Sequence, residues 1–293
     1  MKLRISMIKG SILILLLISL SGCQELADQF LPPETQQEIA DEVQKQADKA
    51  IDQIGQEIKD EAGQILEGIK TDIESEIKSS NPLLYACSTS PSLCPAQTDK
   101  NMSSEWKQVT ALYQNSPEDR NIIYYLAAIH QFKVESDYAC RYRPYPENGC
   151  KPGTEDTRCN IFAADVMRAM KVPLPTKGDL GVGNGTAKYS DPMTANAKSL
   201  HQWLLKEQDG WRRIDVSNQS DLDELLTHLH AGKPGVISDD GHIAVLRPDQ
   251  LMTKLTAAEI GNLLIAQAGA TNKNSITFKK GFGNVNADIF IHD

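Results

Sequence analysis

The sequence predicts an α+β protein in which helices come first and strands come last, behind a long N-terminal helix. Apolar residues repeat every 11 residues over 34–79, and segments between 104 and 206 carry apolar residues at helical spacing. Short segments typical of strands, bounded by Gly, Pro and Asp, follow from residue 211 onward. Because most of the helices come early and most of the strands come late, the pattern favours an α+β domain.

The N-terminus has the layout of an export signal. A basic segment opens the chain, with Lys2, Arg4 and Lys9, and an apolar run follows at 12–20. That run is about nine residues long, too short for a bilayer core that requires roughly 20. The next residues, Leu20-Ser21-Gly22-Cys23, resemble the lipobox of bacterial lipoproteins.

That resemblance implies a signal peptide at 1–22 and a lipid attached to Cys23, followed by a linker at 23–33. In Gram-negative members of that family an Asp after the cysteine tends to retain the protein in the inner membrane. Gln24 therefore favours the outer membrane. We expect an envelope protein held to a lipid bilayer through Cys23.

The segment 34–80 is predicted to be an amphipathic helical stalk. Pro33 precedes it, and Asn81-Pro82 should end it. A 3.67-residue apolar period keeps one stripe on a nearly straight helix, roughly 70 Å long at 1.5 Å per residue. The repeating apolar positions are Val43, Ala47, Ile51, Ile54, Ile58, Ala62, Ile65, Ile69 and Ile73.

Two interpretations of the stripe remain open. It pairs with another helix, either a partner's or that of a second copy, or it lies on lipid. Residues 34–79 hold thirteen Asp/Glu against five Lys/Arg, whereas membrane-surface helices are usually rich in Lys and Arg. This charge favours the helical spacer. The whole chain has a net charge of −9, which argues against a nucleic-acid partner.

The six cysteines predict disulfides and one remaining thiol. Export places the chain in an oxidising compartment, and lipid occupies Cys23. A short polar loop separates Cys87 from Cys94, and another short loop separates Cys140 from Cys150. We therefore expect these two pairs, with crossed pairing as the open alternative. Either pairing leaves Cys159 as the remaining thiol.

The globular domain is expected at 82–293, with a helical subdomain at 82–150. One helix is predicted at about 104–115, and a second begins after Ser116 as N-cap, with Ile122, Ile123, Leu126 and Ile129 on its core face. A third begins at Cys159 with Thr157 as N-cap.

The second half supplies two more helices and the strands. Helices are expected at about 194–206 and from the capping box at Ser220 to Gly232. The expected strands are 211–214, 234–238, 242–246, 263–267, 276–278 and 287–291.

Cys159 and His242 are the residues that indicate chemistry. A thiol in the first turn of a helix lies near unpaired backbone N–H groups, which favour the thiolate. The segments Cys159-Asn-Ile-Phe162 and Gly241-His242-Ile-Ala-Val245 resemble the papain-like cysteine amidases of bacterial cell-wall enzymes, the NlpC and CHAP types. The resemblance covers roughly 155–293 and implies a papain-like domain in which helices precede an antiparallel sheet.

In those families a third polar residue lies on the strand after the histidine strand. Gln267 is the first choice here, although those families usually carry His, Glu or Asn, and Asn272 and Asp288 are the reserves. The resemblance implies that the cysteine attacks an amide bond of peptidoglycan without a cofactor. No metal site is expected, because His228 and His230 are two residues apart on a predicted helix and do not share a face.

Three alternatives stay open. In the first, the protein is a non-catalytic envelope lipoprotein that binds the wall or a partner protein. In the second, it is a transamidase on the same fold. In the third, Cys159 is a buried free thiol and His242 a core histidine with satisfied hydrogen bonds.

Overall fold

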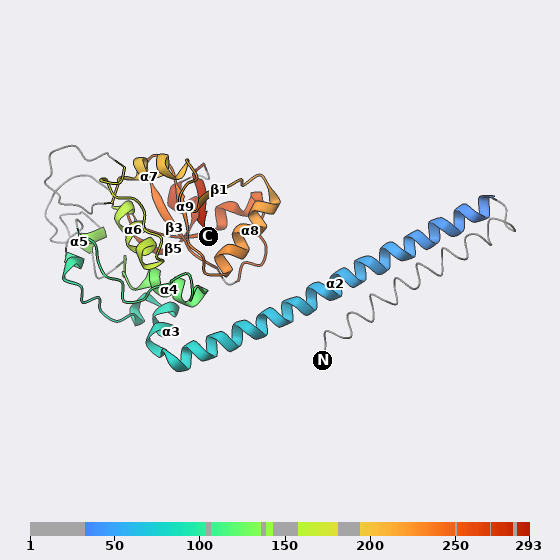
Figure 1. The fold of residues 1–293 in the computed structure, drawn as a ribbon, viewed down its shortest axis with the longest axis horizontal. Coiled ribbons are helices and arrows are strands. Elements are labelled where there is room, and N and C mark those ends of the chain that lie inside the picture. Colours follow the sequence, from blue (N-terminus) through green and yellow to red (C-terminus); the bar gives the residue numbers. More distant parts are fainter. Residues whose placement is uncertain are drawn as a thin grey trace. The chain divides into compact units, whose positions relative to one another are not determined.

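A computed structural model describes residues 33–103, 107–135, 139–142, 158–180, 194–249, 251–269, 271–283 and 286–293 (Figure 1). The chain divides into two compact units, Met1–Asp72 and Ile73–Asp293. The signal segment 1–22, Cys23 and the linker through 32 lie outside the described residues. Within the described part, no helix is both long enough and apolar enough to cross a membrane.

The first unit contains most of α2, a helix that spans Pro33–Ser80. Two side chains of the apolar repeat are clearly exposed along it: Ile51 is 56% exposed and Ile69 is 51% exposed. Glutamine and acidic side chains four residues apart form hydrogen bonds along the surface, such as Gln56 to Asp60 at 2.9 Å. Such pairs contribute only a few tenths of a kcal/mol each.

Short helices open the second unit. Asn81 caps α3 (Pro82–Thr89) by accepting a hydrogen bond from the backbone N–H of Leu84, and Pro82 occupies the first turn. A 3-10 turn, η1 (Pro91–Leu93), then brings Cys94 to Cys87, and the predicted Cys87–Cys94 disulfide is confirmed. A second 3-10 turn, η2 (Lys100–Ser103), follows.

Two predictions for this region are wrong. Residues 107–115, the described part of the helix expected at 104–115, contain bends and irregular chain. Ser116 does not cap a helix; its backbone carbonyl and hydroxyl form a turn with Asp119. Helix α4 (Ile122–His130) begins later because the Asn121 side chain accepts two backbone N–H groups. Its expected apolar face is buried, with Ile129 fully enclosed.

Four more helices follow, of which α6, α7 and α8 contact strands of the sheet. They are α5 (Ala139–Tyr142), α6 (Cys159–Ala169), α7 (Ala197–Leu204) and α8 (Gln219–His230). The expected capping box at Ser220 is replaced by Asn218, whose side chain accepts from the Ser220 backbone N–H. Helix α8 ends before Gly232, which has a φ of 70°. A Cβ added at position 232 would lie 2.3 Å from the Asn121 backbone, so only glycine fits there.

A six-stranded antiparallel sheet forms the second half of the unit, in the order β1-β6-β2-β3-β4-β5. All six strands lie at or within three residues of the predicted segments, and the α+β class is confirmed. The structure adds a 3-10 helix, η4 (Ala257–Asn262), and a short helix, α9 (Phe278–Phe282). Helix α9 begins at Phe278, where the sequence predicted the end of a strand. The strands are β1 (Trp211–Ile214), β2 (Gly235–Ser238), β3 (Ile243–Leu246), β4 (Leu264–Gln267), β5 (Lys273–Thr277) and β6 (Asp288–His292).

The largest core lies between the sheet and the helices. Strands β2 and β3 are buried at every residue, so they appear as continuous apolar runs. Helix α6 packs on β3 and β4 through fully buried Phe162, Val166 and Met167. This packing fixes the first turn of α6 against the beginning of β3, where the candidate site lies.

Candidate functional site

Cys159 is the first residue of α6 and is 1% exposed. It forms no disulfide. The predicted helix start is confirmed, but its N-cap is Arg158, whose side chain makes no capping hydrogen bond, and Thr157 lies outside the described residues. The predicted Cys140–Cys150 pair lies outside the described side chains as well.

His242 is held by the turn between β2 and β3. The Asp239 carboxylate accepts the backbone N–H groups of Gly241 at 2.8 Å and of His242 at 2.7 Å. Strand β3 begins at the next residue, Ile243, so the expected start at 242 is one residue early. The turn therefore presents the imidazole at the end of the sheet against which the first turn of α6 packs.

Gln267, the last residue of β4, contacts the imidazole directly. Its Oε1 lies 3.0 Å from His242 Nε2, and its Nε2 donates to the carbonyl of Thr271 at 3.0 Å. A carbonyl only accepts, so the amide nitrogen must face Thr271 and the amide oxygen must face the histidine. An oxygen acceptor requires the proton on His242 Nε2. The neutral ring therefore has Nδ1 free to accept a proton.

Cys159 supplies the second partner of His242, through a side-chain hydrogen bond. Burial by itself lowers the pKa of His242. The hydrogen bond and charge of Cys159 raise it, as do the hydrogen bond of Gln267 and the charge of Asp239, and the net pKa lies above the ordinary value. These contacts favour the protonated form of the His242 imidazole. The three residues singled out in the sequence are thus joined in one chain of side-chain contacts.

The two reserve residues have other partners. Asn272 is buried, accepts from the Gly269 backbone N–H at 3.0 Å and donates to the Val134 carbonyl at 2.9 Å. It braces the turn that presents the Thr271 carbonyl to Gln267. Asp288 pairs with Arg213 at 2.7 Å and lies 3.6 Å from His201 Nε2.

Helix α9 brings two residues to the site that the sequence reasoning missed. The Phe282 ring lies over the His242 ring, with centroids 4.7 Å apart and planes tilted by 59°. Gly281 lies beside Gln267, and a Cβ at this position would approach Gln267 Oε1 to 2.7 Å. The four-residue spacing of Phe278 and Phe282 is a helical signal, but it lies in a segment partly assigned to a strand.

A buried ion cluster fixes the other side of α6. Asp165 is 2% exposed and accepts four side-chain hydrogen bonds: two from Arg141 at 2.7 and 2.8 Å, one from Tyr142 at 2.7 Å and one from Arg168 at 3.1 Å. Arg141 and Tyr142 belong to α5, directly after Cys140. The cluster therefore ties the chain that enters the predicted Cys140–Cys150 loop to the helix that carries Cys159.

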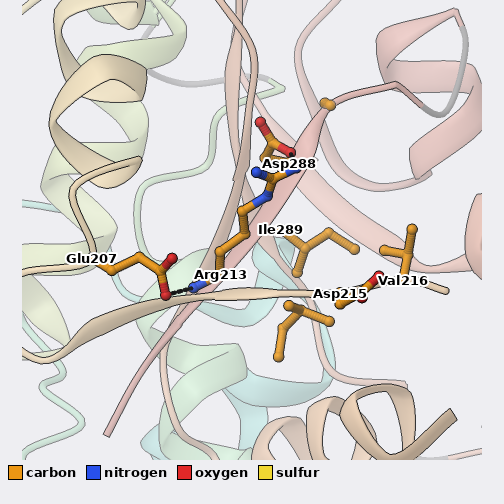
Figure 2. Close-up of a pocket in the computed structure, with 8 residues that line it drawn as sticks. Glu207, Arg213, Asp215, Val216, Asp288 and Ile289 are labelled. Carbon is orange, nitrogen blue, oxygen red and sulfur yellow. Dashed lines mark hydrogen bonds and ion pairs between the residues drawn. The ribbon is translucent and has the colours of Figure 1, made fainter. Parts of the chain in front are cut away.

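A cavity of about 400 Å³ lies at the same end of the sheet as His242. Ser238, which precedes the His242 turn, is paired with Asp288, and Ile214 is paired with Ile289. The ends of β6 and β1 that line the cavity therefore lie at the same edge of the sheet as the His242 turn. Figure 2 shows the Arg213 guanidinium against the Asp288 carboxylate, with Glu207 at one side of the cavity and Asp215 at the other. Three carboxylates and one guanidinium give this lining a formal charge of −2.

His228, His230, Trp203 and Trp211 have structural contacts. His228 Nε2 lies 3.0 Å from the Pro234 carbonyl and His230 Nε2 lies 3.1 Å from the Asp249 carbonyl. In the described ranges, no three His, Cys, Asp or Glu side chains gather as a metal site would require. Trp203 and Trp211 are buried and line a cavity of about 530 Å³ near the end of α6 that lies away from Cys159.

No protein-family model, curated protein or solved structure matches the chain. The geometry defines the class of site: a buried thiol at a helix start, an imidazole and an orienting amide, joined in that order.

Proposed function

We propose that the protein is a cysteine amidohydrolase or endopeptidase with a papain-like domain, and that it cleaves amide bonds of peptidoglycan. The observation that supports this most directly is the series of contacts from Cys159 to His242 to Gln267. A nucleophile, a base and a group that orients the base are the three parts that covalent acyl transfer requires. A core histidine whose role is only packing does not need both a thiol and an amide oxygen as hydrogen-bond partners.

The proton and electron movements follow from these contacts. His242 Nδ1 takes the thiol proton, and the Cys159 sulfur attacks the amide carbonyl carbon. Backbone N–H groups at the start of α6 then stabilise the oxyanion. The amine leaves with the proton from His242, and a thioester remains on Cys159. Water, deprotonated by His242, attacks the thioester and releases the acid and the free thiol. Gln267 holds the ring in one tautomer and stays neutral throughout.

The remaining features support a location in the cell envelope. A lipid on Cys23 would anchor the chain to a bilayer, at the outer membrane in a Gram-negative cell. The segment 34–80 would act as a spacer that pairs with another helix or with a second copy through its isoleucine stripe. Peptidoglycan is a substrate found in that compartment.

The test uses purified cell wall and protein without residues 1–23. The unmodified protein should release soluble fragments with new amino groups, whereas the Cys159→Ala and His242→Ala variants should release none. His230→Ala, an exposed histidine on α8, serves as the matched control and should cleave like the unmodified protein. Equal release by Cys159→Ala would refute the assignment of the nucleophile.

The non-catalytic alternative is favoured by a different observation, the exposed Ile51 and Ile69 on α2. If the protein sediments with the wall but the unmodified chain and Cys159→Ala both leave it intact, a binding role replaces the catalytic one. If a peptide amine added to the wall is joined to it only when Cys159 is present, the protein is a transamidase.

A further inference from the structure

Gly281 is the fourth of the five residues of α9, a helical position at which glycine is a poorer helix former than alanine. Its φ lies outside the left-handed region, so the backbone does not require glycine there. Alanine in place of glycine within a helix stabilises it by about 1 kcal/mol. The presence of glycine at this position therefore needs another physical reason.

That reason is the close approach of α9 to Gln267. A Cβ at position 281 would lie 2.7 Å from Gln267 Oε1 and 2.5 Å from Ile265 Cδ1, both closer than real contacts allow. Ile265 could move its terminal methyl group, since that atom ends a flexible side chain. Gln267 Oε1 is held from the other direction by His242 Nε2 at 3.0 Å, and the amide nitrogen is held by the Thr271 carbonyl.

From this geometry we infer that Gly281 is a positioning residue for the Cys159–His242 pair, acting through the Gln267 amide. The bare backbone of α9 leaves room for Oε1 at the one place where it accepts the His242 Nε2 proton. The next residue, Phe282, lies over the imidazole, so the same short helix contacts both members of the hydrogen bond. A methyl group at 281 displaces the amide oxygen, and His242 loses the acceptor that fixes its tautomer.

The catalytic meaning of this inference rests on the proposed function, but thiol chemistry tests it without a wall substrate. The full-length protein is treated with iodoacetamide between pH 5 and 9, and alkylation of the peptide that contains Cys159 is followed by mass spectrometry. Gly281→Ala should slow alkylation near pH 7 about tenfold, as expected for losing one hydrogen bond to a group that becomes charged. Lys280→Ala, an exposed neighbour on α9, should react like the unmodified protein.

A double-mutant cycle separates positioning from a general loss of structure. In a Gln267→Ala background, Gly281→Ala should have no further effect on the rate, because the group that it displaces is absent. The ¹⁵N shifts of the His242 ring should show the Nε2–H tautomer in the unmodified protein and a mixture in Gly281→Ala. Should the single variant unfold, Ile265→Val with Gly281→Ala removes the closer contact and leaves the one with Gln267.

Two results would overturn the inference. One is an unchanged alkylation rate in folded Gly281→Ala. The other is an equal slowing by Gly281→Ala with and without the Gln267 side chain. Absence of wall cleavage together with the expected thiol effect would refute the proposed function and leave this inference standing. Normal wall cleavage by Gly281→Ala would refute the inference alone.

Discussion

Replacing Asp165 by Asn should destabilise the domain strongly, although the two side chains have nearly the same shape. The carboxylate accepts four hydrogen bonds in a buried site and is the anion that faces Arg141, whose side chain is 1% exposed, and Arg168. An Asn amide turns an NH₂ group toward donors and leaves the cations without their counter-charge. Removing one partner of a buried ion pair typically costs about 3–5 kcal/mol.

That loss is large compared with a total stability of about 5–15 kcal/mol for a folded domain. Urea unfolding followed by circular dichroism should show the lower free energy of unfolding. Thermal unfolding should show a fall in the melting temperature of roughly 10 °C. Asp223→Asn is the matched control, because this exposed α8 carboxylate accepts a hydrogen bond from Gln219 and should change stability by less than about 0.5 kcal/mol. A loss below about 1 kcal/mol in Asp165→Asn would show that the cluster does not hold α5 to α6.

Two further predictions concern stability. Burial lowers the pKa of His130 to about 4, while the unfolded chain takes up this proton near the ordinary value of 6.5, so stability should fall as the pH falls from about 6.5 to 4. Urea midpoints across this range should therefore decrease, and His130→Gln should flatten the dependence; an unchanged slope would contradict this origin. Replacing Cys87 and Cys94 together by Ala should cost about 2–3 kcal/mol, because the disulfide closes a loop with a sequence separation of 7. Differential scanning calorimetry measures that loss, and an unchanged transition would contradict it.

Local patterns were sufficient to predict most of the secondary structure around the site. The helical spacing of the apolar residues Phe162, Val166 and Met167 predicted helix α6 and its first residue, Cys159. The turn at Asp239 and the apolar run after His242 placed β3 to within one residue. These signals survive because each depends on residues adjacent in sequence, and each segment has a face that must be buried.

The predictions failed where a single polar residue decides between neighbouring starts of a helix. Ser116 and Asn121 both have side chains that cap helices, and the sequence offers both. The structure uses Asn121, because Asn115, fully buried, accepts the Asn121 backbone N–H and donates to the carbonyl of Gly232, which follows the end of α8. That contact joins segments far apart in the chain, and no local pattern records it.

The sequence by itself determined that a thiol opens a helix, that a histidine precedes a buried strand, and that Gln267 ends the following strand. Only the tertiary structure decided that the Gln267 amide faces His242 with its oxygen, because the Thr271 carbonyl fixes the nitrogen. It alone placed Gly281 and Phe282 of α9 against this pair. Apolar periodicity depends on burial, which every residue of an element shares, whereas the orientation of one amide depends on a few partners that folding brings together.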